Sequence, residues 1–385
     1  MPSPSPSPSA STASDGVLRI GTLLPTSGRD SATGPGQLAA VHAAIRRVNA
    51  AGGVLGQRVE LVSRSSGDSR ESLDAAFAEL AERGVDAVIG PSDSVLASRT
   101  AQLAAEAGIP VVSPAATGPI LADADGWLFR TAPAYERHGA VLGRLLPAGG
   151  QARVAILYTD GPAGLPLVAP LRAALAEHDG ELVATQRIQA GADLAAVVAA
   201  LAEEAPDAVV LATGDTGDLT RGAIAALTDA GLGHERLWLV TRNAGDYSDD
   251  LDRGMLAGAG ALIDGSAGDE AFRRLVQQED PHARRLRFVA EAFDAATLVA
   301  LAAEAAGSDA GSAIRAALPE ASAGGATCRS FGECLAVLGD GQDLDYAGVS
   351  GPVDLDEAGD VGSGTYAVHR YGDGNTAEWV STETG

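Results

Sequence analysis

Two turns between Val85 and Thr117 carry the residues best suited to binding chemistry. VDAVIGPSDS and IPVVSPAAT each end an apolar run at a turn that bears Ser or Thr. Short Val- and Ile-rich runs are typical of buried parallel strands, and the ligand-binding turns of an open α/β sheet follow such strands at their carboxyl ends. Hydroxyls and free backbone N–H groups at helix starts favour an anion such as a carboxylate. The pattern therefore indicates capture of a small molecule.

Composition and charge narrow the classes of function. The 385 residues include no lysine, and the net charge is −24. A phosphate-binding P-loop and a Schiff base both need a lysine, so neither is expected. The negative charge argues against nucleic acid or an anionic membrane as the main partner, because both attract basic patches. Solubility and genome bias are a sufficient explanation for most of that charge.

Motifs for catalysis, cofactors and metals are missing from the sequence. The six histidines are scattered without metal-ligand spacing, and no Gly-x-Ser-x-Gly elbow or Ser–His–carboxylate set occurs. GPGQLA (34–39) matches a loose dinucleotide fingerprint, but about ten loop residues separate it from the preceding strand, where the fingerprint needs a tight turn. We therefore expect no catalytic residue, no cofactor and no metal.

The cysteines and the N-terminus both point to export. Cys328 and Cys334 flank RSFGE, which favours a small structural disulfide over a redox or metal pair. Residues 1–16 form a Pro/Ser/Ala tract, expected to be a disordered linker. Such tracts often follow the lipid-modified cysteine of bacterial surface proteins, so we expect a lipid-anchored precursor on the extracellular face of the membrane. A cytosolic protein with a flexible tail is the alternative.

Alternating strand-like and helix-like runs predict an α/β fold. Regular βαβ alternation implies parallel sheets with helices on both faces, and a restart near Gln151 predicts two doubly wound parallel-sheet lobes. Predicted strands span 17–24, 58–63, 87–90, 110–113, 153–159, 182–188, 208–212 and 237–241. Predicted helices span 37–50, 70–82, 95–107, 136–146, 165–177, 194–204, 218–230, 271–278 and 283–306.

The C-terminal region has a different pattern. GDGN between apolar runs at 364–371 and 377–381 is a strong hairpin signal. The preceding segment, DLDYAGVSGPVDLDEAGD, is rich in turn residues and predicts a loop.

An ordered series of phrases carries a family resemblance. GTLLPTSG, VNAAGGVLGQRVEL, VIGPSDS, IPVVSPAAT, LFRTAP and DLDYAGVSGPVDLD occur in this order. Together they resemble the branched-chain amino-acid-binding (Leu/Ile/Val-binding) family of ABC-transporter type I periplasmic solute-binding proteins, from about Val17 onward. The Cys pair also resembles one found in many members. The resemblance implies two lobes joined by three crossovers, closing like a hinge: 17–133 plus 268–322, and 134–267 plus 325–385.

The same resemblance indicates which residues bind one end of the ligand. In the family, turns matching GPSDS and SPAAT hold the ligand carboxylate. Here these turns supply Ser94, Ala115 and Thr117, with backbone N–H groups and hydroxyls as donors. The alternative is that Ser94 and Thr117 only cap helices or turns.

The opposite half of the expected pocket departs from the family pattern. Tyr135 stands where amino-acid binders commonly have Asp, DGPAG (160–164) where they have a Tyr-Gly pair, and Arg242 and Asn243 where they have an ammonium partner. A desolvated α-ammonium needs such acceptors, so an ordinary amino acid is in question. The remaining candidates are Tyr135 and Phe293 as apolar walls or core, Asn243, and Asp215, Asp246 or Tyr247 as replacement acceptors.

The sequence thus predicts an exported monomer that captures a small carboxylate-bearing ligand by hinge closure for an ABC permease. A ligand-sensing module with the same fold is the alternative. An α/β hydrolase ranks third, because no triad or metal set supports it. A member that has lost its ligand is also consistent with the altered residues.

Overall fold

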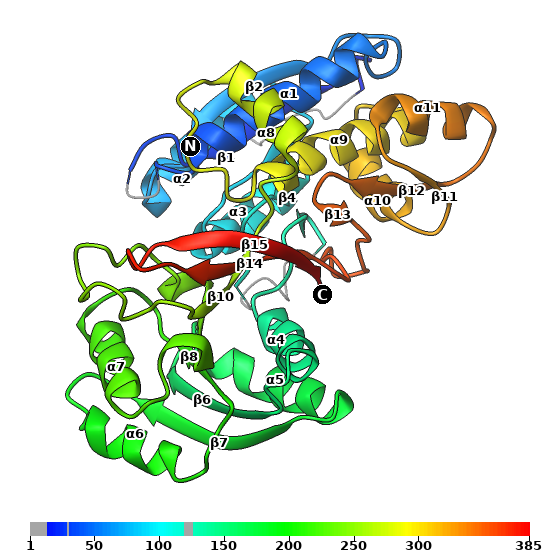
Figure 1. Ribbon diagram of the computed structural model, residues 1–385. Helices are drawn as coiled ribbons and strands as arrows, with labels where there is room; N and C mark the ends of the chain where they lie inside the picture. The colour runs from blue at the N-terminus through cyan, green and yellow to red at the C-terminus, as the bar shows by residue number, and fades with distance from the viewer. Residues whose placement is uncertain (1–13, 29–30, 119–125) are drawn as a thin grey trace, which may run out of the picture. The chain divides into compact units, whose positions relative to one another are not determined.

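The computed structural model describes residues 14–28, 31–118 and 126–385 (Figure 1). Most of the N-terminal linker expected at 1–16 lies outside these residues. In the part of the chain that is described, no helix is both long enough and apolar enough to cross a membrane.

The chain divides into two compact units. Unit 1 contains the chain up to Ala134 together with Gly265–Gly364, and unit 2 contains Tyr135–Asp264 and Thr365–Gly385. The backbone therefore passes between the units three times. Each unit holds parallel strands connected through helices, which confirms the expected α/β fold with two doubly wound lobes.

Unit 1 is built on a five-stranded parallel sheet of order β2-β1-β3-β4-β5. Its strands are β1 (Arg19–Leu24), β2 (Glu60–Ser65), β3 (Ala87–Ile89), β4 (Val111–Ser113) and β5 (Leu128–Arg130). Its helices are α1 (Gly34–Ala50), α2 (Arg70–Glu82), α3 (Ser94–Ala107), α8 (Glu270–Glu279), α9 (Val289–Ala306), α10 (Gly311–Ser322) and α11 (Phe331–Gly339).

The core of unit 1 forms around α9. This Ala-rich helix is buried on all sides from Val289 to Ala303 and packs with α1 in one apolar cluster. Small alanine side chains let neighbouring helices approach closely, which suits a helix with no solvent-facing side. The helix predicted over 283–306 begins later than expected, because Phe288 before it adopts a left-handed backbone conformation with φ of 60°.

Unit 2 is built on a seven-stranded sheet of order β15-β14-β10-β9-β8-β6-β7. Its strands are β6 (Arg153–Thr159), β7 (Glu181–Ile188), β8 (Ala208–Ala212), β9 (Leu237–Val240), β10 (Gly260–Asp264), β14 (Thr365–Tyr371) and β15 (Ala377–Thr384). Its helices are α4 (Arg137–Ala148), α5 (Leu165–Glu177), α6 (Leu194–Ala202) and α7 (Asp218–Asp229), with short 3₁₀ turns at His234–Arg236 and Thr241–Asn243.

The predicted C-terminal hairpin is confirmed at the edge of that sheet. β14 pairs antiparallel with β10 on one side and with β15 on the other (Figure 1). The turn closes through Asn375, whose N–H donates to the carbonyl of Gly372 at 3.0 Å and whose φ is 54°. Asn tolerates this left-handed conformation better than most residues do, which explains the strength of the GDGN signal.

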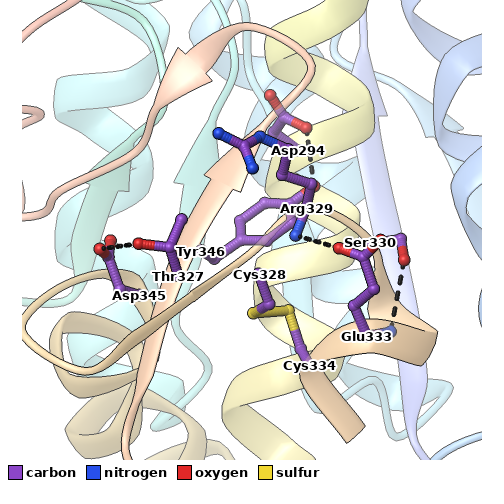
Figure 2. Close-up of a disulfide and its surroundings, with 9 residues drawn as sticks. All are labelled: Asp294, Thr327, Cys328, Arg329, Ser330, Glu333, Cys334, Asp345 and Tyr346. Atoms are coloured by element: carbon purple, nitrogen blue, oxygen red, sulfur yellow. Dashed lines mark hydrogen bonds between the residues drawn. A yellow bond between two sulfur atoms is a disulfide. The ribbon is translucent and has the colours of Figure 1, made fainter. Parts of the chain in front are cut away.

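The expectation that residues 325–364 belong to the lobe of unit 2 is wrong, because they pack within unit 1. They form a small sheet of β11 (Ala326–Cys328), β12 (Leu344–Gly348) and β13 (Gly351–Pro352) where a loop was predicted. A disulfide joins Cys328 to Cys334 (Figure 2). Both half-cystines and Tyr346 are buried in the cluster that contains α1 and α9, and this burial fixes the segment in unit 1.

A buried carboxylate ties the same segment to α9. Asp294 is fully buried, and its two oxygens accept hydrogen bonds from the Tyr346 hydroxyl, the Val349 N–H, and both the N–H and the hydroxyl of Ser350, at 2.6–2.9 Å. Burial raises the pKa of Asp294, and the four donors oppose that rise. Figure 2 shows Asp294 and Tyr346 near the disulfide. Four donors to one side chain make Asp294 the main polar anchor of the 344–350 segment.

Asp86 gives unit 1 a predicted pH dependence. Burial, followed by repulsion from Asp309 and Asp15, raises the pKa of Asp86 from 3.8 to about 7, against the N–H of Arg19 that donates to its Oδ2 at 2.7 Å. A carboxyl group whose pKa is higher in the folded state than in the unfolded state stabilises the fold most at low pH. That contribution is lost as the pH rises from the unfolded-state pKa through the folded-state pKa. Asp86 thus favours folding at pH 4 more than at pH 8.

We therefore expect Asp86→Asn to raise the free energy of unfolding at pH 8 by on the order of 2 kcal/mol, with little change at pH 4. The asparagine oxygen can still accept the Arg19 N–H, so packing is kept. Urea titrations of both proteins from pH 4 to 8 measure this. Parallel pH profiles for the two proteins would show that Asp86 does not titrate in this range.

Candidate ligand-binding site

The two turns singled out in the sequence follow neighbouring strands of unit 1. GPSDS (90–94) leads from β3 into α3, and SPAAT (113–117) follows β4, which pairs with β3. Asp93 is the N-cap of α3, since its Oδ1 accepts the N–H groups of Val95 and Leu96 at 2.9 Å each. These two helix-start donors are therefore already used, and Ser94 is the first residue of the helix rather than its cap.

Two serine hydroxyls connect the turns. Ser94 Oγ accepts the N–H of Gly118 at 3.0 Å, and Ser113 Oγ donates to the carbonyl of Pro91 at 2.6 Å while accepting the N–H of Ala116 at 3.0 Å. A hydroxyl that accepts one bond keeps its own hydrogen to donate, so Ser94 can still donate to a ligand. These bonds hold the turns in one arrangement before any ligand arrives.

Ala115 and Thr117 supply the remaining donors. Among the described residues, neither the N–H of Ala115, the N–H of Thr117 nor the Thr117 hydroxyl has a hydrogen-bond partner. Thr117 is 8% exposed and Ala115 is half-buried. Partly buried donors without partners are costly, and an anionic acceptor would satisfy them. The turn thus has the chemistry that a carboxylate requires.

Arg130, which the sequence interpretation did not select, braces this turn from within unit 1. The residue is 2% exposed, and its side chain forms an ion pair with Asp360 and donates through Nη1 to the carbonyls of Ala116 and Gly118 at 3.4 and 3.2 Å. Because C=O and N–H of one trans peptide point in opposite directions, the bond to the Ala116 carbonyl directs the Thr117 N–H away from Arg130. The sequence signal that could have identified Arg130 is a charged residue at the end of the apolar run LFR.

Asn243 and Tyr247, two candidates of unit 2, are structural. Asn243 is fully buried; its Oδ1 accepts the N–H of Val240 at 2.8 Å, and its Nδ2 donates to the Leu211 carbonyl and Thr213 Oγ1 at 2.8 and 2.9 Å. Tyr247 is equally buried and donates its hydroxyl to the Asn243 carbonyl at 2.6 Å. Burial raises the pKa of Tyr247 well above its ordinary value. These polar groups complete the core of unit 2, and a role of either residue in ligand binding stays a prediction.

The proposed apolar walls are also core residues. Tyr135 is 2% exposed, donates its hydroxyl to the Ala163 carbonyl at 2.9 Å, and packs on the His138 ring with centroids 4.7 Å apart. Phe293 lies in the core cluster of unit 1, edge-to-face with Phe272 at 5.3 Å. Both rings are buried within their own units, which fits the core alternative, and a ligand-lining role for either stays a prediction.

The two carboxylates proposed as replacement acceptors, Asp215 and Asp246, are accessible in unit 2. Asp215 follows β8 and accepts the N–H of Gly217 at 2.8 Å, and Asp246 follows the neighbouring strand β9 and accepts the N–H of Ser248 at 2.9 Å. Both are exposed. The Ser248 N–H lowers the pKa of Asp246, which keeps it ionised. A role of either residue in ligand binding stays a prediction.

Comparison with known proteins places the chain in a family. A model described as "Periplasmic binding protein" matches residues 17–331. The chain is 32% identical over 360 residues to the chemotactic signal transduction system substrate-binding protein BasB of Halobacterium salinarum, across 88% of this chain and 83% of that one. It is 29% identical over 150 residues to the Leu/Ile/Val-binding protein homolog 2 of Brucella abortus, covering 38% of this chain and 40% of that one.

Solved structures show the same fold. The branched-chain amino acid transporter substrate binding protein LivJ of Streptococcus pneumoniae, in complex with isoleucine, gives a TM-score of 0.67 at 21% identity, covering 96% of this chain and 99% of that one. A solute binding protein of R. palustris in complex with benzoate gives 0.62 at 19% identity, covering 95% and 96%. The chain belongs to the periplasmic binding protein family, which confirms the resemblance to its Leu/Ile/Val-binding members.

Proposed function

We propose that the protein captures a small carboxylate-bearing ligand outside the cytoplasm through the donors of Ser94, Ala115 and Thr117. The observation that carries this proposal is the set of donors on the Ala115–Thr117 turn that no other described residue satisfies. Isoleucine and benzoate, the ligands named for the LivJ and R. palustris proteins, share a carboxylate. Benzoate has no ammonium group, which fits a chain that lacks the family's usual ammonium partners.

Delivery to an ABC permease is the role that accompanies this binding. Family membership implies an extracytoplasmic location. We propose further that the protein acts as a monomer, that a lipid anchor is present in the precursor, and that closure of unit 2 over ligand held by unit 1 creates the form that a permease recognises. Differential affinity for the closed form would drive that change.

Ligand sensing is the second candidate. The BasB relative, which matches over most of both chains, is named as part of a chemotactic signal transduction system. Capture chemistry would be the same, and only the partner of the closed form would differ. Co-purification of the ligand-bound protein with permease subunits or with a membrane receptor separates the two roles.

Thermal unfolding with matched pairs of compounds tests the proposed ligand class. Isoleucine and benzoate each have an amide counterpart, isoleucinamide and benzamide, that lacks the negative charge. A ligand at 100 times its Kd stabilises the folded state by about 2.7 kcal/mol. We expect a carboxylate in the panel to raise the Tm and its amide to have little effect. Equal shifts with acid and amide would contradict the proposal.

Thr117→Val removes one donor without changing the shape of the side chain. Because hydrogen bonds to charged groups contribute about 1.5–3 kcal/mol, we expect the variant to bind the carboxylate roughly 10- to 100-fold more weakly. Isothermal titration calorimetry measures the change, and Thr382→Val on the exposed side of β15 is the matched control. Unchanged affinity in Thr117→Val would remove this residue from the site.

A further inference from the structure

A cavity lies wholly within unit 2. Its volume is about 580 Å³, within the usual range for small-molecule sites. Lining residues include Gln151, Glu235 and Gly258, which precede β6, β9 and β10. The cavity therefore opens at the amino ends of these parallel strands, whereas ligand-binding turns of such sheets follow the carboxyl ends. It is thus separate from the site proposed above, which belongs to unit 1.

Arg370 is the functional group of this cavity. Gly260 lies between Trp238 on β9 and Arg370 on β14 in one row of paired residues. A Cβ at Gly260 would lie 2.5 Å from the indole, so only glycine lets the Trp238 ring lie across β10. The Arg370 guanidinium then stacks over this ring, 4.6 Å from its centroid. The stack holds the guanidinium in place at the cavity wall.

Arg370 forms no ion pair among the described residues, although the exposed Glu235 attracts its charge. Its Nη1 donates to the Gly258 carbonyl at 3.1 Å, and the ion pairs formed by the described residues do not include it. Burial lowers the pKa of Arg370, opposed by attraction to the exposed Glu235. In a chain of net charge −24, a half-buried arginine without an ion-pair partner has donors available for an anionic ligand.

The remaining walls are preformed and partly apolar. Gln151 accepts the Trp238 indole N–H at 3.0 Å and donates to the Glu235 carbonyl at 2.9 Å, which fixes the cavity floor. Val368 pairs with Ser381 and His369 with Trp379, so Val380 is the extra residue of a β-bulge in β15. A bulge redirects side chains, and here both Val380 and Ser381 line the cavity together with Leu145 of α4.

We propose that this cavity is a second small-molecule site for a carboxylate carried on a short aliphatic chain. The carboxylate binds the guanidinium of Arg370 beside the Ser381 hydroxyl. The aliphatic chain lies against Leu145, Val368 and Val380. A guanidinium presents paired donors that match the two oxygens of a carboxylate, and the apolar walls select against small inorganic anions.

Sodium hexanoate tests this site in the whole chain through the indole N–H of Trp238. The protein has three tryptophans, and Trp127→Phe and Trp379→Phe assign the Trp238 indole signal in a ¹⁵N spectrum by elimination. We expect hexanoate to shift this signal in a saturable way. Arg370→Gln should weaken binding at least about tenfold, because the charge-assisted bonds are lost. Val380→Asp, at a position 51% exposed, should weaken it as much by placing a like charge in the cavity.

Several results would overturn the proposal. One is that hexanoate does not move the Trp238 indole signal, and another is that both variants bind hexanoate as tightly as the unaltered protein does. The proposal also fails if hexanol or inorganic phosphate binds as tightly as hexanoate. The double variant Ser94→Ala, Thr117→Val should leave the Trp238 response unchanged, since those residues belong to unit 1. A response lost in that variant would place the hexanoate outside this cavity. Failure here is therefore distinguishable from failure of the proposed function.

Discussion

Replacing Arg130 by methionine is expected to lower the free energy of unfolding by about 3 kcal/mol and to abolish high-affinity carboxylate binding. Methionine fills much of the same volume but leaves Asp360 without its cation and the carbonyls of Ala116 and Gly118 without their donor. The Ala116–Thr117 peptide is then free to rotate, so the Thr117 N–H loses its fixed direction. Arg130 thus links the stability of unit 1 to the geometry of its binding turn.

Urea denaturation and calorimetry measure the two effects separately. Arg99→Met is the matched control, because Arg99 pairs with Asp74 on the surface and exposed pairs contribute about 1 kcal/mol or less. If Arg130→Met were as stable as Arg99→Met, the ion pair with Asp360 would not support the fold. A destabilised Arg130→Met that still binds carboxylate with normal affinity would contradict the positioning role.

The second large effect is expected at Asp294. Asp294→Ala removes the acceptor of four hydrogen bonds and leaves their donors buried, so we expect a loss of about 4 kcal/mol in the free energy of unfolding. Asp294→Asn should have an intermediate effect, because its one amide oxygen can satisfy only one of the two donor pairs. The exposed Asp340, which follows α11 as its C-cap, provides the control variant, Asp340→Ala.

Hydrogen exchange locates the Asp294 effect within the fold. Tyr346, Val349 and Ser350 should lose protection in Asp294→Ala more than the strands of the parallel sheet do, because the carboxylate connects their segment to α9. Uniform loss of protection throughout unit 1 would show that Asp294 is not a local anchor. Stability equal to that of Asp340→Ala would remove it as an anchor altogether.

The parallel sheets could be predicted because their signal is local. Arg153–Thr159 and Ala208–Ala212 form as predicted, since each is a continuous apolar run of the kind that a doubly buried strand requires. β5 was missed because its run LFR ends in a charged residue and lacks the Val and Ile that mark the equally short β3 and β4. The segment 325–364 was assigned to the other lobe because long-range packing, through Cys328, Cys334 and Tyr346, decides its place. Local patterns carry no information on such contacts.

The candidate site, like the fold, could be predicted from the sequence only in part. Ser94 and Thr117 lie on turns that follow strands, and their position relative to those strands is visible in the sequence. For Asn243, Tyr135 and Phe293 the sequence does not separate core from pocket, because a buried polar or aromatic side chain in the core has the same local sequence as one that lines a pocket. Arg130 was missed because its role depends on carbonyl groups brought near it only by folding.

The most direct test of the central claim is the ¹H–¹⁵N signal of two backbone amides, those of Ala115 and Thr117, during titration with benzoate. A carboxylate held by these N–H groups should move both proton signals downfield in a saturable way, with the same Kd that calorimetry gives. If benzoate or isoleucine binds and both amide signals stay in place, the carboxylate is held elsewhere and the account is contradicted.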